Sequence, residues 1–218
     1  MEVVEHVVLF KTVQGASHTD IEAWASGLRA LRTLQGVIHL HVGHLPSCRP
    51  NHGDWTHALY ARYKDKDSLQ AYAVHPDHIS AVSRGTNLFS EVMAMDWVAT
   101  MKPPISPTLA PVSSSPSWVA FVRWAPQASS QEVIFNLIST LGYSDQMAAF
   151  TFGPNFSPAR ARGFEWGFAL FDNGDGDEEG KTKLTNAYDS FHLLMQRPEV
   201  EKFLLVEFSP MHGLAASM

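Results

Sequence analysis

The chain has 218 residues, of which 45% are hydrophobic and 17% charged, so it holds enough apolar material for a packed core and too few charges for a disordered chain. Its formal net charge is −6 and it has no basic run, which argues against nucleic acid or an anionic membrane as a partner. The single cysteine, Cys48, excludes an internal disulfide and a metal site built from several cysteines.

The amino-terminal sequence bears on where the protein resides. Met1-Glu2-Val3-Val4-Glu5-His6 carries acids where a signal peptide carries basic residues, and no apolar run approaches the length of a transmembrane helix. Together with the lone cysteine, this predicts an intracellular, cytoplasmic protein that is neither secreted nor membrane-bound.

A strand is expected over residues 3–11, where β-branched and apolar residues predominate. The side chains that alternation places on one face are Val4, His6, Val8 and Phe10. A helix follows, opened by the capping-box spacing of Thr19-Asp20-Ile21-Glu22. Its expected apolar side consists of Ile21, Trp24, Leu28 and Leu31.

The rest of the first hundred residues completes a βαββαβ order. Strands are expected over residues 37–45 and 55–63. Asp65 or Asp67 caps a short helix that runs to residue 74, and Pro76 interrupts it because proline lacks a backbone donor and restricts the residue before it. A second short helix over 76–84 and a strand over 89–99 close the unit.

A proline-rich segment divides the chain. Its prolines are Pro103, Pro104, Pro107, Pro111 and Pro116, mixed with serines and small residues that favour extended backbone. We therefore place an N-terminal domain at residues 1–100, a linker at 101–116 and a divergent C-terminal domain at 117–218.

The second half repeats the signals of the first. A strand over 118–124 is followed by the capping box Ser129-x-x-Glu132 and by an apolar helix that ends before Gly142. Later strands are expected over 164–171 and 203–208. Each half alone would expose an apolar sheet face, so we expect the two sheets to pair within one chain and the protein to be a monomer, or at most a weak dimer.

Several segments of the first half carry a family resemblance. They are Glu5-His6-Val7-Val8-Leu9-Phe10-Lys11, Thr56-His57-Ala58-Leu59, Leu69-Gln70-Ala71-Tyr72-Ala73-Val74-His75-Pro76-Asp77-His78 and Met95-Asp96-Trp97-Val98. Together they resemble the stress-responsive A/B barrel (Dabb) family. In the second half, the stretch from Phe152 to Ala161 is similar to two-domain plant members.

The resemblance implies an α+β fold of two tandem ferredoxin-like domains whose sheets pair into an α/β barrel, with a cavity between each sheet and its helices. One single-domain member of the family is a polyketide cyclase, which closes a linear polyketide by aldol condensation. The residues similar to its pocket are His6, His57, Tyr72 and His78.

Histidines are concentrated in the first half, which holds nine of the eleven in the chain. Histidine titrates near neutrality and suits abstraction of a proton next to a carbonyl. We assign His78 as the base and Tyr72 as the group that orients it or donates to the substrate oxygen. His6, His57 and His75 are assigned to substrate binding.

Each of these residues also has a structural interpretation. His75 precedes Pro76 and suits a helix end, while His78 suits a cap of the next helix. His6 and His57 alternate with apolar neighbours and suit buried structural histidines, and Tyr72 shares a helical face with the core.

No cofactor or metal is expected. His39 and His41 project from one strand face and His44 from the other, so no single strand assembles three ligands. The acidic stretch at 175–180 resembles the start of a calcium loop, but Asn186 stands where the bidentate glutamate is needed. The second half has Val200 at the place of His78, so we expect it to be a structural partner that completes the barrel.

Two functions remain open from the sequence. The first is a cavity that binds a small, largely apolar oxygenated molecule and acts as a lyase or cyclase of the polyketide cyclase type. The second is a non-catalytic protein of stress or defence. An apolar pocket into which Tyr72 and His78 both point would favour the first.

Overall fold

The computed structural model describes residues 2–45, 54–100, 115–128, 149–171, 189, 192–193 and 195–210. The elements of the first half are β1 (Glu2–Thr12), α1 (His18–Ala30), η1 (Leu31–Thr33), β2 (Val37–His44), β3 (His57–Tyr63), α2 (Lys66–Ala73), α3 (Pro76–Gly85) and β4 (Phe89–Thr100). Those of the second half are β5 (Trp118–Trp124), β6 (Ala149–Pro154), η2 (Pro158–Arg160), β7 (Trp166–Phe171), β8 (Val200–Glu207) and β9 (Ser209–Pro210).

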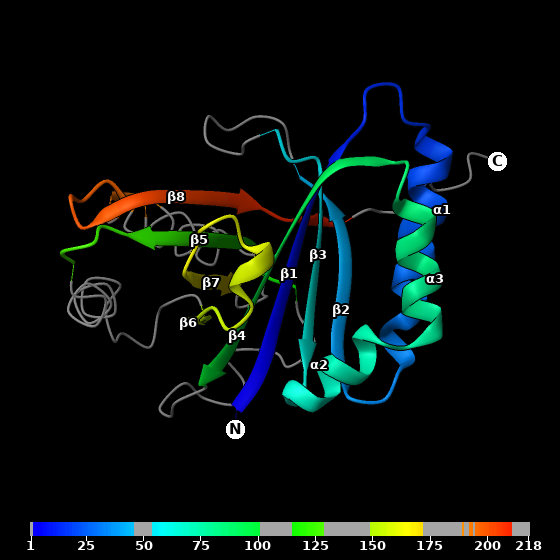
Figure 1. Ribbon diagram of the computed structural model, residues 1–218, viewed down its shortest axis with the longest axis horizontal. Helices are drawn as coiled ribbons and strands as arrows, with labels where there is room; N and C mark the ends of the chain where they lie inside the picture. The colour runs from blue at the N-terminus through cyan, green and yellow to red at the C-terminus, as the bar shows by residue number, and fades with distance from the viewer. Residues whose placement is uncertain are drawn as a thin grey trace, which may run out of the picture.

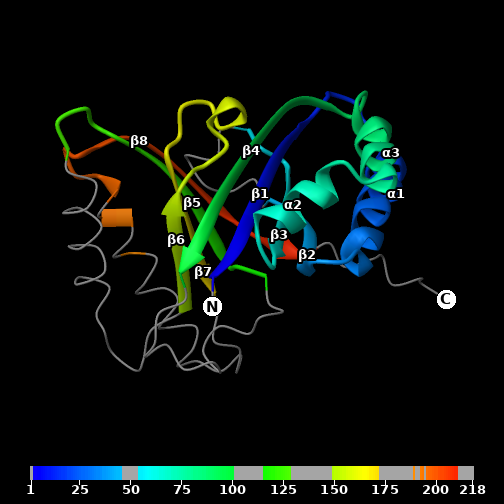
Figure 2. The same cartoon turned by 60° about the horizontal axis from the view of Figure 1, so that its bottom comes forward.

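The strands form two antiparallel sheets that face each other. One has the order β4-β1-β3-β2-β9 and the other the order β6-β7-β5-β8. Helices α1, α2 and α3 lie on the side of the first sheet that faces away from the second sheet (Figures 1 and 2). Each face of β1 is therefore covered, which explains why nearly all of its residues are buried.

The local signals of the first half are largely confirmed. Asp65 caps α2 by accepting from the Ser68 N–H at 2.7 Å, and α3 begins at Pro76. The predicted capping box at Thr19 is wrong: α1 starts at His18, and Ser17 is its cap. The helix still buries the predicted apolar side, because a shift of its start leaves its periodicity unchanged.

In the second half, β5 has the bounds expected from the sequence, while β7 and β8 begin two residues later and three residues earlier than expected, respectively. The capping box at Ser129, its helix and the acidic stretch at 175–180 lie outside the described residues. So does most of the proposed linker, and the domain boundaries stay a prediction.

The two sheets are joined at both edges. On one side β9 continues the first sheet by pairing with β2, where Gly43 is opposite Pro210. On the other side Trp97 forms a bridge with Asn155, and the Phe156 N–H donates to the Asp96 carbonyl at 3.0 Å. The sheets thus enclose one interior, as expected of a barrel formed within a single chain.

The interior between the sheets is filled by apolar side chains of both halves. They include Val7, Leu9, Met95 and Trp97 from the first half, and Val119, Phe121, Phe171 and Val206 from the second. Trp97 fits because Gly153 and Gly167 face it: a Cβ at Gly167 would overlap its ring, and one at Gly153 would lie 2.6 Å from the Val98 carbonyl oxygen.

Within the described residues, no helix is long and apolar enough to span a membrane.

Candidate functional site: a cavity beneath the first sheet

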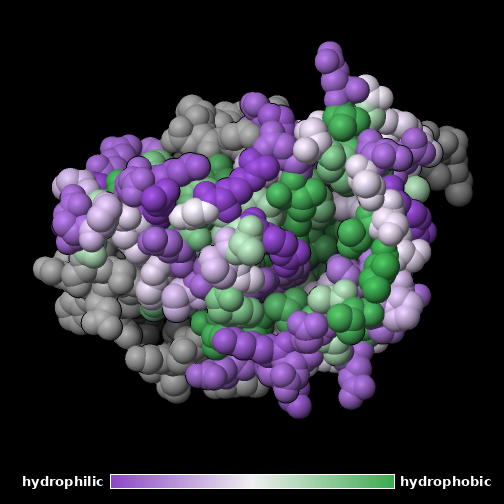
Figure 3. Space-filling view, viewed as in Figure 1, coloured by the Kyte–Doolittle hydropathy of each residue, from purple (hydrophilic) through white to green (hydrophobic). Residues whose placement is uncertain are grey.

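A cavity of about 810 Å³ opens between the first sheet and its helices. Apolar side chains are gathered in a hollow between β4 and α3 in Figure 3. The apolar part of the lining comes from several elements and includes Val8, Phe10, Trp24, Leu28, Leu59, Leu69, Val82, Phe89 and Val92. A cavity of this size and character suits a small organic molecule.

One end of the cavity is formed by aromatic rings. The Trp24 ring centroid lies 4.8 Å from that of Phe10 and 4.4 Å from that of Phe89, and the latter two are 5.0 Å apart. Such a cluster provides a rigid apolar surface for a hydrocarbon group.

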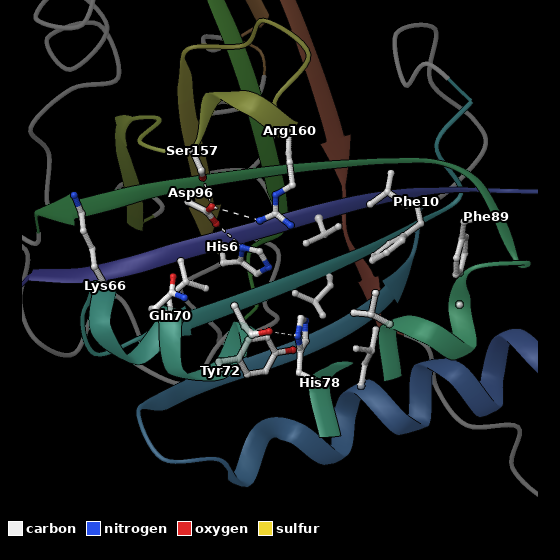
Figure 4. Close-up of a pocket in the computed structure, with 18 of the residues that line it drawn as sticks. His6, Phe10, Lys66, Gln70, Tyr72, His78, Phe89, Asp96, Ser157 and Arg160 are labelled. Atoms are coloured by element: carbon white, nitrogen blue, oxygen red, sulfur yellow. Dashed lines mark hydrogen bonds and ion pairs between the residues drawn. The ribbon is translucent and has the colours of Figure 1, made fainter. Parts of the chain in front are cut away.

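Tyr72 and His78 lie together on the helical wall, as predicted. The break at Pro76 separates α2 from α3, and the two ring centroids are 4.5 Å apart (Figure 4). The Nδ1 of His78 lies 3.0 Å from the Ala73 carbonyl oxygen. Because a carbonyl only accepts, Nδ1 carries the proton, and Nε2 of the neutral ring is left with its lone pair.

The environment sets the protonation of both groups. Burial lowers the pKa of His78 from its ordinary value, and the hydrogen bond to Ala73 offsets only part of this effect. Burial raises the pKa of Tyr72 to about 12. At neutral pH the site therefore holds a neutral imidazole, which can accept a proton, beside a phenol, which can donate one.

His6 lies on the sheet wall opposite, paired with an acid. Its Nδ1 donates to Asp96 Oδ1, and both side chains are buried. Asp96 also accepts from the Ser157 hydroxyl and lies 3.8 Å from an Arg160 nitrogen. Burial opposes ionisation of Asp96, but His6, Ser157 and Arg160 overcome it and hold the pKa of the carboxyl below its ordinary value.

The second half supplies part of this wall. Phe156, Ser157 and Arg160 line the cavity together with residues of the first half. The second half, which was expected to be a structural partner that completes the barrel, therefore also contributes side chains to the cavity lining. Asn155 holds the segment in place, because its side-chain oxygen accepts from the N–H groups of Asp96 at 3.2 Å and Ser157 at 3.0 Å.

Two of the predicted substrate-binding histidines do not line the cavity. The His75 side chain caps α3 by accepting from the Asp77 N–H at 3.2 Å. His57 is buried on β3, with Nδ1 3.0 Å from the Thr56 hydroxyl. Burial, with the nearby charges of His44 and His18, lowers the pKa of His57 to about 4, so this ring is neutral at pH 7.

No group of three or more His, Cys, Asp or Glu side chains that could hold a metal ion occurs among the described residues. The ionisable groups that the described residues bring to the cavity are imidazole, phenol, carboxylate, guanidinium and ammonium groups.

Asp96, Ser157 and Arg160 line the cavity although alternation and spacing do not point to them. One feature of the sequence could have identified Asp96 as a candidate site residue, because it is a lone acid within an apolar stretch of β4. In the sheet it is the direct cross-strand partner of His6, and such partners lie on the same face.

Comparisons with known proteins agree with this architecture. Residues 4–99 match the Stress responsive A/B Barrel Domain family, Dabb. The chain is 35% identical over 170 residues to a stress-response A/B barrel domain-containing protein of Arabidopsis thaliana. That match covers 75% of this chain and 62% of the relative, so it spans less than two thirds of the relative's length.

Two further proteins match nearly the whole chain. The stress-response A/B barrel domain-containing protein DABB1, also of Arabidopsis thaliana, is 29% identical over 212 residues, which cover 95% of this chain and 96% of DABB1. The crystal structure of a putative monooxygenase from Fusobacterium nucleatum superposes with a TM-score of 0.56 at 10% identity, covering 96% of this chain and 93% of its own.

The structural match supports the fold alone, and it extends over both halves. Together with the two facing sheets, this match confirms the predicted fold class, which is two tandem ferredoxin-like domains whose sheets pair into a barrel. Residues 4–99 form a domain of the stress-responsive A/B barrel (Dabb) family, and the chain as a whole is similar to stress-response A/B barrel domain-containing proteins of Arabidopsis thaliana.

Proposed function

We propose that the cavity of the first half binds a small, largely apolar oxygenated molecule and catalyses its ring closure without a cofactor. The observation that carries this proposal is the pairing of a neutral His78 with a protonated Tyr72 on one wall of an otherwise largely apolar cavity. The Arabidopsis relatives are named stress-response proteins, which supports a role of this protein in a stress response.

The proposed reaction is an intramolecular aldol addition. The Nε2 of His78 removes a proton from a carbon next to a carbonyl, and the resulting enolate carbon attacks a second carbonyl of the same molecule. A carbon–carbon bond forms, and the carbonyl oxygen becomes an alkoxide. Tyr72 donates a hydrogen bond to that oxygen as its charge develops. The protonated His78 then gives its proton to the alkoxide, which becomes a hydroxyl, so the neutral imidazole is restored and no external reagent is consumed.

The apolar lining has a chemical role in this scheme. It excludes water from the enolate and strengthens the hydrogen bond from Tyr72, because electrostatic interactions are weaker in water than in a low-dielectric site. The aromatic end formed by Phe10, Trp24 and Phe89 holds the hydrocarbon part of the substrate.

The test uses nonane-2,6-dione, a diketone that closes to a six-membered ring by aldol addition, followed by NMR. We expect the wild-type protein to accelerate closure and His78→Gln to lower the rate by about 10²–10⁴-fold, the usual contribution of a general base. Tyr72→Phe should lower it by about tenfold, the equivalent of one hydrogen bond of ordinary strength. The matched control is His18→Gln, which removes an exposed histidine outside the cavity.

Unfolding of the variants is followed in urea to separate activity from stability. Full activity in His78→Gln, or loss of activity that merely follows unfolding, would overturn the assignment of the base. A wild-type protein that binds the diketone without closing it would overturn the catalytic proposal and favour a non-catalytic binding protein.

A further inference from the structure

Arg160 reaches the cavity from the second half and lies on the same side as Asp96 and Ser157 (Figure 4). The segment that carries it is anchored at Asn155, which bridges to Trp97 and whose backbone N–H donates to the Glu165 carbonyl at 2.8 Å. The Arg160 guanidinium is thus attached to a fixed backbone while its side chain remains 62% exposed.

The charge of Arg160 is only weakly engaged within the protein. Its one ion pair with a described residue joins it to Asp96 Oδ2 at 3.8 Å, a distance beyond hydrogen-bonding range. Both Asp96 oxygens already accept stronger hydrogen bonds, Oδ1 from His6 and Oδ2 from Ser157. Arg160 has no hydrogen bond to any described residue, so its fork of N–H groups is available to a ligand.

The other charges around the cavity favour a single anionic group. Among the described residues, four fully charged side chains line it: Lys66 and Arg160 are cationic, and Asp67 and Asp96 are anionic. Asp96 is engaged by His6, Asp67 is exposed at the start of α2, and the Lys66 ammonium lies 4.3 Å over the Phe156 ring. Within the described part of the chain, Arg160 thus offers a single guanidinium, which matches a carboxylate in charge and shape, whereas a phosphate dianion favours further cations.

We propose that Arg160 is a specificity-determining residue that binds a carboxylate of the ligand at the cavity mouth. The ligand class is then an organic acid whose hydrocarbon part lies against the aromatic end and whose carboxylate pairs with the second half. This inference rests on the proposed function, because it requires a ligand within the cavity.

The test compares two probes of the same shape, 4-butylbenzoate and the neutral 4-butylbenzamide. Binding is measured by calorimetry and by quenching of tryptophan fluorescence, since Trp24 lines the cavity. We expect the wild-type protein to bind the benzoate about 10-fold to 100-fold more tightly than the benzamide, the range of a hydrogen-bonded ion pair. Arg160→Ala should abolish this preference by weakening binding of the benzoate far more than binding of the benzamide, and Arg160→Lys should retain part of the preference.

The matched control is Arg162→Ala. Arg162 belongs to the same segment but pairs with Glu91 at 2.5 Å and lies over the Trp55 ring, outside the cavity lining. This variant should keep the preference, and its loss there would mean that overall charge, not contact with Arg160, attracts the acid.

The outcomes separate the two proposals. Equal binding of both probes to the wild-type protein, or a preference that survives Arg160→Ala, would overturn the role of Arg160 and leave the cavity proposal standing. If neither probe binds while nonane-2,6-dione is still cyclised, the acid class is wrong. If no probe binds and nothing is cyclised, both proposals fall.

Discussion

Two neighbouring residues of β1, Glu5 and His6, are both buried and both engage an oppositely charged or ionisable group, yet their surroundings differ. Glu5 points between the two sheets, where it accepts from Tyr60 at 2.6 Å, Arg62 at 2.7 Å and Thr151 at 3.0 Å. His6 points to the helix side, where Asp96 engages one ring nitrogen and the cavity lies next to the ring.

The difference shows that burial of a charge does not by itself indicate a functional site. The Glu5 cluster is closed: Arg62 is fully buried, and burial with the charge of Glu5 raises the pKa of Tyr60, so its phenol stays a donor. These groups join β1 and β3 to β6 of the second half. The His6 cluster adjoins a space large enough for a ligand, and there a ring nitrogen can do chemistry.

The largest effect on stability is expected at Glu5. Glu5→Ala leaves the Arg62 guanidinium buried without its counter-charge, which should lower the free energy of unfolding by about 3–5 kcal/mol. Urea unfolding followed by circular dichroism measures this. The control is Glu91→Ala, whose ion pairs lie at the surface, where solvent screens them, and should therefore contribute far less to stability. Equal costs for the two variants would show that the Glu5 cluster is not a structural centre.

A smaller effect is expected on the cavity face, at Asp96. Asp96→Asn weakens the hydrogen bond to His6 and should cost about 2 kcal/mol at pH 7. Because the folded protein holds the pKa of Asp96 below its ordinary value, the stability this group adds is present above that value and is lost as pH falls through the folded pKa.

The free energy of unfolding, measured in urea at pH 7 and at pH 3, should therefore decrease less on acidification in Asp96→Asn than in the wild-type protein. Asp67→Asn, an exposed acid of the same cavity, serves as control. An acid dependence of Asp96→Asn identical to that of the wild-type protein would contradict the expected coupling to His6.

The smallest effect concerns His57, which lies on the helix side of the first sheet without an acid partner. Its pKa in the folded protein is about 4, against an ordinary value of 6.5. At pH values between these two, His57 binds more protons in the unfolded chain than in the folded protein. The stability that the neutral His57 contributes is therefore fully present above about pH 6.5 and decreases as the pH falls towards 4.

The resulting loss of unfolding free energy should be on the order of 1 kcal/mol. His57→Gln should flatten the curve of unfolding free energy against pH in that window, and His18→Gln, which removes only the smallest of the named causes of the His57 shift, should flatten it much less. A curve that keeps its full slope in His57→Gln would assign the dependence to other histidines, such as His39, whose pKa burial also lowers to about 4.

Local signals predicted most of the first half. Alternation along β1 separates the two buried faces correctly, since Val4, Val8 and Phe10 pack under the helices. Asp65 and Pro76 determine where α2 begins and where α3 begins, because both act on the adjacent backbone. At Ser17 and Thr19 two similar caps compete, and the sequence alone does not rank them.

Local sequence patterns could not predict the contacts between residues that are distant in the sequence. Tyr72 and His78 are close in sequence on either side of a helix break, so their proximity could be expected. Glu5 gains its partners from β3 and from Thr151, 146 residues away. The placement of Ser157 and Arg160 depends on how the second sheet meets the edge of the first, which no local pattern encodes.

The fit of Trp97 against two glycines has a consequence for how the two halves pair. The barrel-facing side chains of β3 in the first half include the bulky Tyr60 and Arg62. The second half instead presents Gly153 and Gly167, where an added side chain would overlap the Trp97 ring or the neighbouring backbone. The first half is therefore complementary in shape to the second half.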